Sequence, residues 1–350
     1  MKKNFKDILT IGGRQQHYDL IDFLKGFSIF TIVLMHLVQN YLISVSSFIF
    51  KASALGGAGV HIFILCSGVG LYMSYRRSQS TFIQFIIKRF TKIYIPYIIV
   101  VIISSLIPFM YEGKDRILAL LSHVFLFKMF MPIYESSFGG QLWYISTLFQ
   151  LYLAFIPLCR LKEKMRNRKT FFFVFLFVSI GWWLISYFTG ISDERIWGSF
   201  FLQYIWEFVL GICIADYLAD GNDIMINKLV LYIFTCVGLI VFGVMSLSSG
   251  FLKTFNDIFS VIGYGGLAIS IYSLGIGCVN KLGFWISKIS YEWYLVHILI
   301  FNIVFYIVSV EQLMMSVIVG IIAVTISIAV AYFYHKEIIT VRNATRRHRE

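Results

Sequence analysis

The hydrophobic pattern of the chain is a series of long apolar runs separated by short polar segments. A helix that crosses a bilayer needs roughly 20 mostly apolar residues, because the hydrocarbon core is about 30 Å thick. The runs of this length predict ten transmembrane helices, at 20–43, 57–75, 93–111, 141–159, 171–189, 198–219, 228–247, 257–277, 286–308 and 313–335. The stretch 117–132 is apolar but shorter and carries Lys128, so it predicts an interfacial or re-entrant segment.

These spans predict an all-α, polytopic membrane protein. The transmembrane domain is expected over 18–335, with a cytoplasmic N-terminal tail at 1–17 and a basic cytoplasmic tail at 336–350. Hydrophobic residues make up 59% of the 350 positions and charged residues only 14%, whereas soluble domains carry about 25% charged residues. The composition therefore excludes an ordinary soluble enzyme, a disordered chain and a fibrous repeat.

The formal net charge of +12 arises from 30 Lys and Arg residues against 18 Asp and Glu. Cytoplasmic loops collect Lys and Arg, so topology explains most of this charge and predicts that both termini are cytoplasmic. The ten spans leave few cations for the opposite side, namely Lys51, Lys114, Arg116, Lys128, Arg195 and Lys253. We therefore expect the lipid bilayer as a partner and no nucleic acid.

The five cysteines lie singly in or beside apolar runs. They form no CxxC motif and show no spacing typical of metal ligands. The sequence therefore predicts neither a disulfide nor a metal site.

The first span contains Asp22, Lys25 and His36 in an otherwise apolar sequence. Ionisable residues within a span are costly and mark candidate functional sites. The spacing places Lys25 and His36 on one helix face, about 16 Å apart along the axis, and allows Asp22 to pair with Lys25. Snorkelling explains Asp22 and leaves Lys25 open, but His36 lies too deep for it. A histidine at this depth can act as a general base, as an acyl carrier or in a proton relay.

Other ionisable residues of the apolar segments have a structural explanation at least as good as a catalytic one. Glu207 lies near the middle of its span, and His297 ends a polar-aromatic helix face. His61 begins the second span, and His123 lies in the short apolar segment. Each of these side chains, taken singly, is explained equally well by a hydrogen bond within the helix packing.

A basic segment precedes the third span. Lys88, Arg89 and Lys92 recur there at a helix start, where cations and backbone N–H groups favour phosphate binding. A phosphorylated donor that arrives from the cytoplasm fits this position. The basic loop 160–169, by contrast, is explained by topology and by contact with anionic lipid.

Five segments form an ordered set along the chain. The first runs from Lys25 to His36, and the others are GVHIFILCSGV (59–69), KRFTKIYIP (88–96), LWYISTLFQLYLAFIP (142–157) and ISYEWYLVH (289–297). Together they resemble the motifs of acyltransferase family 3, integral-membrane proteins that O-acylate bacterial surface glycans. The set extends over nearly the whole chain and fits the stand-alone type that modifies polysaccharides and other glycans.

The resemblance implies that acyl-CoA, usually acetyl-CoA, is the donor substrate and reacts from the cytoplasmic side, with no permanently bound cofactor. His36 would be the catalytic residue, with Lys25 as its partner and Asp22 beside Lys25. The resemblance also implies that Arg89 and Lys92, with Lys88, hold the donor phosphates. Lys25 and Lys92 stand where the family commonly has Arg, which keeps the charge but loses bidentate geometry.

The acceptor implied by the resemblance is a hydroxyl of a cell-surface glycan or of its lipid-linked precursor. The candidate acceptor-binding residues come from the matching segments and the polar spans: Ser67, Trp143, Tyr144, Glu207, Tyr291, Tyr294 and His297. The prediction is thus a multi-pass O-acetyltransferase of the bacterial cytoplasmic membrane.

Two other functions suit a chain with intramembrane charges. A transporter or flippase would be expected to show inverted repeats with matched broken helices, and the sequence shows no such repeat. A polysaccharide polymerase would be expected to carry a large extracytoplasmic loop, whereas 112–140 is modest and partly apolar. Both functions stay as alternatives to the acyltransferase.

Overall fold

The structure, a computed structural model, describes residues 8–12, 14–110 and 115–347. The chain forms two compact units, each assembled from segments that are distant in sequence. Unit 1 comprises Met1–Ser28, Gly57–Ile86 and Thr147–Ser287, and unit 2 comprises Ile29–Gly56, Ile87–Ser146 and Lys288–Glu350. Three long helices contribute residues to both units: α1 (Arg14–Asn40), α7 (Trp143–Lys164) and α15 (Gly277–Ile307).

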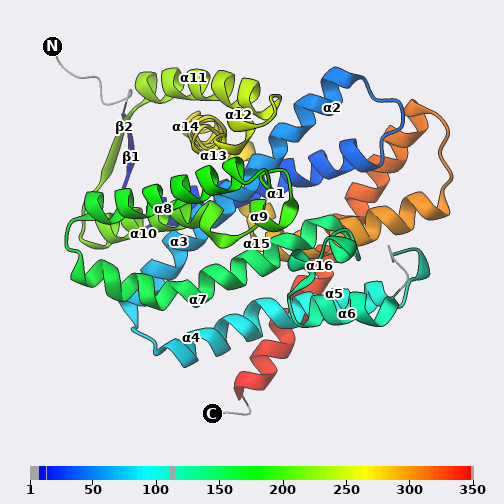
Figure 1. Cartoon of the computed structure of the whole chain (residues 1–350), viewed down its shortest axis with the longest axis horizontal. Helices are drawn as coiled ribbons and strands as arrows, with labels where there is room; N and C mark the ends of the chain where they lie inside the picture. Colours follow the sequence, from blue (N-terminus) through cyan, green and yellow to red (C-terminus); the bar gives the residue numbers. More distant parts are fainter. Residues whose placement is uncertain (1–7, 13, 111–114, 348–350) are drawn as a thin grey trace. The chain divides into compact units, whose positions relative to one another are not determined.

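The regular structure described in unit 1 is helical apart from one two-stranded ribbon. Its other helices are α3 (Gly59–Arg77), most of α4 (Phe82–Arg89), α8 (Arg168–Phe188), α9 (Arg195–Gly198), α10 (Phe201–Ala219), α11 (Lys228–Ser246), α12 (Phe251–Thr254), α13 (Asp257–Ser260) and α14 (Gly266–Ser273). The strands β1 (Ile8–Ile11) and β2 (Ile224–Asn227) pair antiparallel, with Ile8 opposite Asn227 (Figure 1). The hydrophobic pattern does not anticipate this ribbon, because each strand has only four residues.

Glycines bring α3 and α10 of unit 1 into close contact. A Cβ atom placed on Gly68 of α3 would lie 2.2 Å from a backbone carbonyl oxygen of α10. A Cβ atom on Gly211 of α10 would lie equally close, 2.2 Å, to a carbonyl oxygen of α3. Small residues allow such backbone approach between membrane helices, where packing drives association. The contact aligns the two helices that carry His61 and Glu207.

Unit 2 consists of helices joined by short turns. The helices are α2 (Ser47–Ser53), α5 (Ile95–Ser105), α6 (Arg116–Val124) and α16 (Leu313–Arg347), together with a π-helical turn, η3 (Phe90–Tyr94). The short 3-10 turns are η2 (Ala54–Ala58), η4 (Pro108–Met110), η5 (Lys128–Phe130), η6 (Pro132–Tyr134) and η7 (Gly140–Leu142). The 117–132 segment is thus a short helix followed by turns. Helix α16 runs past residue 335, where the last span was expected to end.

Within the described ranges, eight helical segments are long and apolar enough to cross a membrane. They correspond to eight of the ten expected spans. The expected span at 93–111 contains only the 11-residue helix α5, which begins after the π-helical turn. The expected span at 257–277 is a shorter apolar helix, Asp257–Ser273, interrupted by a second π-helical turn, η8 (Val261–Gly265). The polytopic helical fold is confirmed, while the count of ten and the side of the termini stay predictions.

Candidate active site

Two histidines that are far apart in the sequence meet in unit 2. His36 lies near the end of α1 and His297 lies on α15. Nδ1 of His36 is 2.9 Å from Nε2 of His297, and the two rings are nearly parallel with centroids 5.1 Å apart. His297 is fully buried and His36 is half-buried. The pair therefore joins a fully buried histidine to a partly exposed one.

The hydrogen bonds of His297 determine which nitrogen carries its proton. Nδ1 of His297 lies 3.0 Å from the carbonyl oxygen of Trp293, which can only accept, so Nδ1 carries the hydrogen. In the neutral ring, Nε2 then holds the lone pair, and the contact with His36 requires Nδ1 of His36 to donate. His36 consequently keeps its own lone pair on Nε2, which is the form that a general base or a nucleophile needs.

Aromatic residues of the candidate site pack beside His297. The Tyr294 hydroxyl donates to the carbonyl oxygen of Gln141 at 2.5 Å, and its ring centroid lies 6.3 Å from that of His297. Tyr144 packs edge-on against Tyr294, and Trp143 packs edge-on against Tyr144. Tyr294 and Tyr144 are buried, so they shape the surroundings of the histidine pair and hold the start of α7 against α15.

Besides the histidine pair, α15 also contacts the residue that follows α1, and the sequence did not predict this contact. The Tyr41 hydroxyl donates to Oδ1 of Asn302 at 2.6 Å, and Nδ2 of Asn302 donates to the sulfur of Met110 at 3.1 Å. Asn302 is an isolated amide in an apolar span, and this isolation was the signal available in the sequence. The contact fixes the end of α1 one turn beyond His36.

The basic segment of unit 2 forms an irregular turn. Lys88 and Arg89 end α4, and Lys92 lies in the π-helical turn η3 that leads into α5. Lys88 and Lys92 are exposed and Arg89 is half-buried. Turns of the π type inside helices occur frequently at functional sites.

Side chains from α15 and α16 hold this turn through its carbonyl groups. Pro96 has no N–H, so the carbonyl oxygen of Lys92, four residues earlier, loses its usual helical partner. The Arg342 guanidinium of α16 donates to this oxygen at 2.8 Å. The Tyr291 hydroxyl of α15 donates to the carbonyl oxygen of Ile93 at 2.6 Å. The backbone that presents the basic side chains is therefore fixed by α15 and α16.

The remaining candidate residues belong to unit 1. Lys25 lies 3.8 Å from Asp22, so the expected ion pair is present, and both side chains are half-buried. Ser67 is half-buried on α3. Glu207 is fully buried and meets His61 instead of the aromatic candidates.

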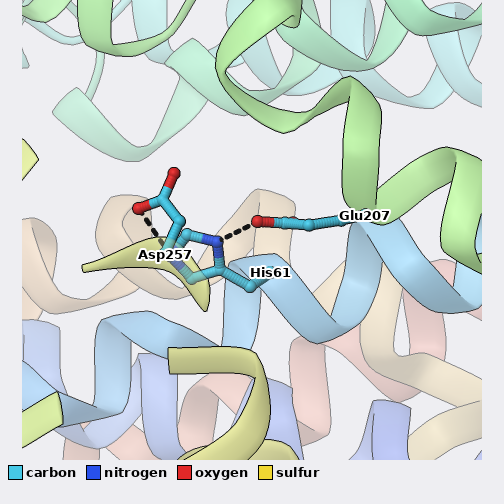
Figure 2. Close-up of side chains that lie close together, drawn as sticks. All are labelled: His61, Glu207 and Asp257. Atoms are coloured by element: carbon cyan, nitrogen blue, oxygen red, sulfur yellow. Dashed lines mark hydrogen bonds and ion pairs between the residues drawn. The ribbon is translucent and has the colours of Figure 1, made fainter. Parts of the chain in front are cut away.

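Figure 2 shows the cluster around His61 in unit 1, with His61 between two carboxylates. Its Nδ1 lies 2.6 Å from Oε1 of Glu207, and its Nε2 lies 3.8 Å from Oδ1 of Asp257. Nε2 of Gln203 donates to the other oxygen of Asp257 at 2.6 Å. Glu207 was considered from the sequence as an isolated residue, and Asp257 was not considered. Only the packing of α3, α10 and α13 brings them together.

Some of the Lys and Arg residues that we attribute to membrane topology also have a packing role in unit 1. These are Arg76, Lys162 and Arg168. Asp216 on α10 accepts hydrogen bonds from Arg76 at 2.9 Å and Arg168 at 2.6 Å, and it pairs with Lys162 at 2.9 Å. Arg76 and Arg168 also reach Asp220. The cations therefore tie one end of α10 to α3, α7 and α8 in addition to any effect on orientation.

The family model of an acyltransferase domain matches residues 18–334, nearly the whole chain. The chain belongs to acyltransferase family 3. It is therefore a multi-pass membrane acyltransferase. No curated protein and no solved structure matches it significantly.

For this acyltransferase, the last motif is the structural link among the motif segments of unit 2. Its histidine, His297, contacts His36 of the first motif. Tyr291 binds the backbone of the basic motif, and Tyr294 binds the residue that precedes the Leu142–Pro157 motif. Motifs that are separated by up to 261 residues thus meet through one face of α15.

Proposed function

We propose that this membrane acyltransferase transfers an acetyl group, or a similar short acyl group, from cytoplasmic acyl-CoA to a glycan hydroxyl. The acceptor is a cell-surface glycan or its lipid-linked precursor, and the enzyme resides in the bacterial cytoplasmic membrane. The observation that carries the proposal is the His36–His297 pair, which leaves a lone pair on Nε2 of His36. Family membership supplies the reaction class.

The proposed donor is anionic, and the cations of the chain suit it. Arg89 and Lys92, with Lys88, bind the phosphates of acyl-CoA at the turn that Arg342 and Tyr291 hold in place. Lys25, paired with Asp22, supports the catalytic residue in the first motif. Acyl-CoA acts as a substrate and leaves as CoA.

Direct transfer uses His36 as a general base. Nε2 of His36 removes the proton of the acceptor hydroxyl while its oxygen bonds to the thioester carbonyl carbon. The carbon–sulfur bond then breaks, and the departing thiolate takes up that proton. The products are the glycan ester and the free thiol of CoA.

Transfer in two steps uses His36 as an acyl carrier. Nε2 attacks the thioester, the thiolate leaves, and it takes up the proton released by the acyl-imidazolium. The acceptor hydroxyl then receives the acyl group, and its proton returns to the imidazole. Both routes need the same lone pair, and rapid quenching after mixing with labelled donor distinguishes them, because only the second leaves label on the protein.

The acceptor side of the proposal rests on polar and aromatic residues near the candidate site. The rings of Trp143, Tyr144, Tyr291 and Tyr294 suit stacking against a sugar. Tyr294 lies beside His297 and packs against Tyr144, which packs against Trp143. Ser67 and Glu207 belong to unit 1, where Glu207 is occupied by His61. We therefore propose that the acceptor is bound mainly by the aromatic residues.

Deletion of the gene in its host, followed by analysis of surface glycans, tests the proposed function. O-acetyl groups should disappear from one glycan and return with the wild-type gene but not with His36→Ala expressed at the same level. Unchanged O-acetylation in the deletion strain would overturn the proposal. A loss of the whole glycan would favour the transporter or polymerase instead.

A further inference from the structure

The cluster around His61 in unit 1 contains two buried carboxylates and one histidine. The proposed acyl-transfer steps give this cluster no role. Glu207 is fully buried and only 13% of the Asp257 side chain is exposed, yet within the described part of the chain their ion pairs are both with His61. Burying a charge without a partner is expensive. A metal ion binds the neutral imidazole. With His61 in that form, two ionised carboxylates would leave two negative charges, which one divalent cation would neutralise.

The distances distinguish the two sides of His61. The 2.6 Å contact between Nδ1 and Oε1 of Glu207 is a hydrogen bond. The 3.8 Å gap between Nε2 and Oδ1 of Asp257 is too long for one. Two ligands of a tetrahedral zinc ion lie about 3.4 Å apart, given metal–ligand distances of about 2.1 Å. The gap is therefore close to the separation of two atoms that share a metal ion.

Nε2 of His61 and Oδ1 of Asp257 belong to side chains whose other polar atom is already hydrogen-bonded. Glu207 binds the opposite nitrogen of His61, and Gln203 binds the other oxygen of Asp257. Metal-binding histidines commonly donate their second N–H to a carboxylate, and metal-binding carboxylates are themselves hydrogen-bonded. The cluster reproduces both arrangements with four residues from α3, α10 and α13.

An independent observation is that one buried carboxylate oxygen of the cluster lacks a hydrogen-bond donor within the described ranges. Oε2 of the buried Glu207 has no hydrogen-bond partner among the described residues. Buried carboxylate oxygens are normally paired, so this atom calls for a donor. A water bound to a metal ion beside His61 would supply one, since such water is a strong hydrogen-bond donor.

We propose that His61 Nε2 and Asp257 Oδ1 bind a divalent transition-metal ion, with Glu207 and Gln203 holding the two ligands in place. The donor atoms of His61, Glu207 and Asp257 all lie within 4.8 Å of one another, so small side-chain shifts suffice. Imidazole nitrogen with carboxylate oxygen suits Zn²⁺ and related ions, whereas Ca²⁺ and Mg²⁺ prefer shells built mostly of oxygen. The ion joins three helical segments of unit 1, independently of the proposed acyl transfer.

The sequence analysis predicted no metal site because positions 61, 207 and 257 have no characteristic ligand spacing. The donors come from separate elements, and Asp257 begins a helix of only four residues. Tertiary packing is therefore the first level at which the site can be recognised.

Zinc binding by the full-length, tag-free protein in detergent tests the proposal. The protein is stripped with chelator, dialysed against Zn²⁺, Mg²⁺ or Ca²⁺, and analysed for bound metal and for Tm. Wild type should retain one Zn²⁺ per chain and show a Tm that rises with free Zn²⁺, by mass action on the folded state. Wild-type protein that retains no zinc and shows no such rise would overturn the proposal.

Isosteric variants locate the ion. Asp257→Asn should weaken Zn²⁺ binding by more than about 100-fold and Glu207→Gln by about 10- to 100-fold, since the first removes a ligand and the second an orienting charge. The matched control is Glu292→Gln, which alters another buried carboxylate that faces a histidine, His335, at 3.2 Å. Equal binding by Asp257→Asn and wild type would contradict the assignment.

X-ray absorption on zinc-loaded wild type decides the question even if a variant fails to fold. The proposal requires a shell of nitrogen and oxygen at about 2.0–2.2 Å that includes one imidazole. A shell with sulfur would place the zinc on cysteines, of which Cys236 and Cys278 are exposed, and would overturn the proposal.

Discussion

His36 and His297 are 261 residues apart in the sequence, and their ring nitrogens lie 2.9 Å apart. The backbone carbonyl of Trp293 fixes the proton of His297, and His297 in turn fixes the proton of His36. A chain of two hydrogen bonds therefore connects the backbone of α15, through His297, to His36 on α1. This connection makes His297 a positioning residue whose effect is measured through His36.

Replacement of His297 by leucine should lower kcat by about 100-fold, the low end of the range for general-base catalysis, because His36 loses the acceptor that fixes its tautomer. KM for acyl-CoA should stay close to wild type, since the cations proposed to bind the donor, Lys88, Arg89 and Lys92, lie in another segment of the chain. Steady-state kinetics with purified protein measure both constants. His335→Leu is the matched control and should keep wild-type kcat. A His297→Leu enzyme with full kcat would contradict a positioning role of His297.

Replacement of Arg342 by alanine should raise KM for acyl-CoA more than it lowers kcat. The change leaves the carbonyl oxygen of Lys92 without its guanidinium donor, and so loosens the turn that presents Lys92. Thr340→Ala, at an exposed position of the same helix, serves as control. An unchanged KM would show that the turn holds its shape without α16.

The lowered pKa of His123 should make the stability of the fold depend on pH. This residue lies on α6, outside the eight candidate spans, where burial and then the nearby Lys128 ammonium hold the pKa of His123 well below its ordinary value of 6.5. The unfolded chain binds this proton below about pH 6.5 and the folded chain does not. Stability is therefore fully present above that pH and falls by about 1.4 kcal/mol per unit as the pH drops toward the folded pKa.

Thermal unfolding in detergent from about pH 7.5 to about pH 5 checks this dependence. Wild type should lose Tm more steeply than His123→Gln, in which the titrating group is absent. The comparison uses slopes, so a lower Tm of the variant at all pH values does not affect it. Parallel slopes would mean that His123 is not held neutral.

The glycine contact between α3 and α10 gives a matched pair of stability variants. Gly211→Ala should destabilise by about 1–3 kcal/mol, because the added methyl group meets a backbone carbonyl that cannot move aside. Gly70→Ala on α3, where the added methyl group meets open space, should be neutral or stabilise by up to about 1 kcal/mol. Tm of the two variants measures the difference. Equal effects would contradict the close approach.

The sequence predicts the fold class well, because apolar runs of about 20 residues have few alternatives to membrane helices. Eight spans follow directly from this pattern. The segments around Pro96 and Gly263 also read as spans, yet each contains a π-helical turn and a shorter helix. Hydropathy counts apolar residues and carries no information on backbone hydrogen bonding, so it cannot detect these turns.

The candidate site could be predicted in part. His36 and His297 were both identified from the sequence, but their contact depends on how α1 and α15 pack. The Asp22–Lys25 pair follows from helical spacing alone, and it is present. Asn302 stands out as an isolated amide, but its partner Tyr41 lies in another element, and the same holds for Asp257 and its partner His61. Local spacing is readable from sequence, whereas contacts between distant helices are not.

Transfer of label from acetyl-CoA tests the central claim most directly. Membranes that carry wild type, His36→Ala or Thr340→Ala at equal levels are incubated with radiolabelled acetyl-CoA and the host glycolipid fraction. We expect wild type and Thr340→Ala to transfer label to a glycan hydroxyl with release of CoA, and His36→Ala to be slower by at least about 100-fold. Undiminished transfer by His36→Ala would contradict the account.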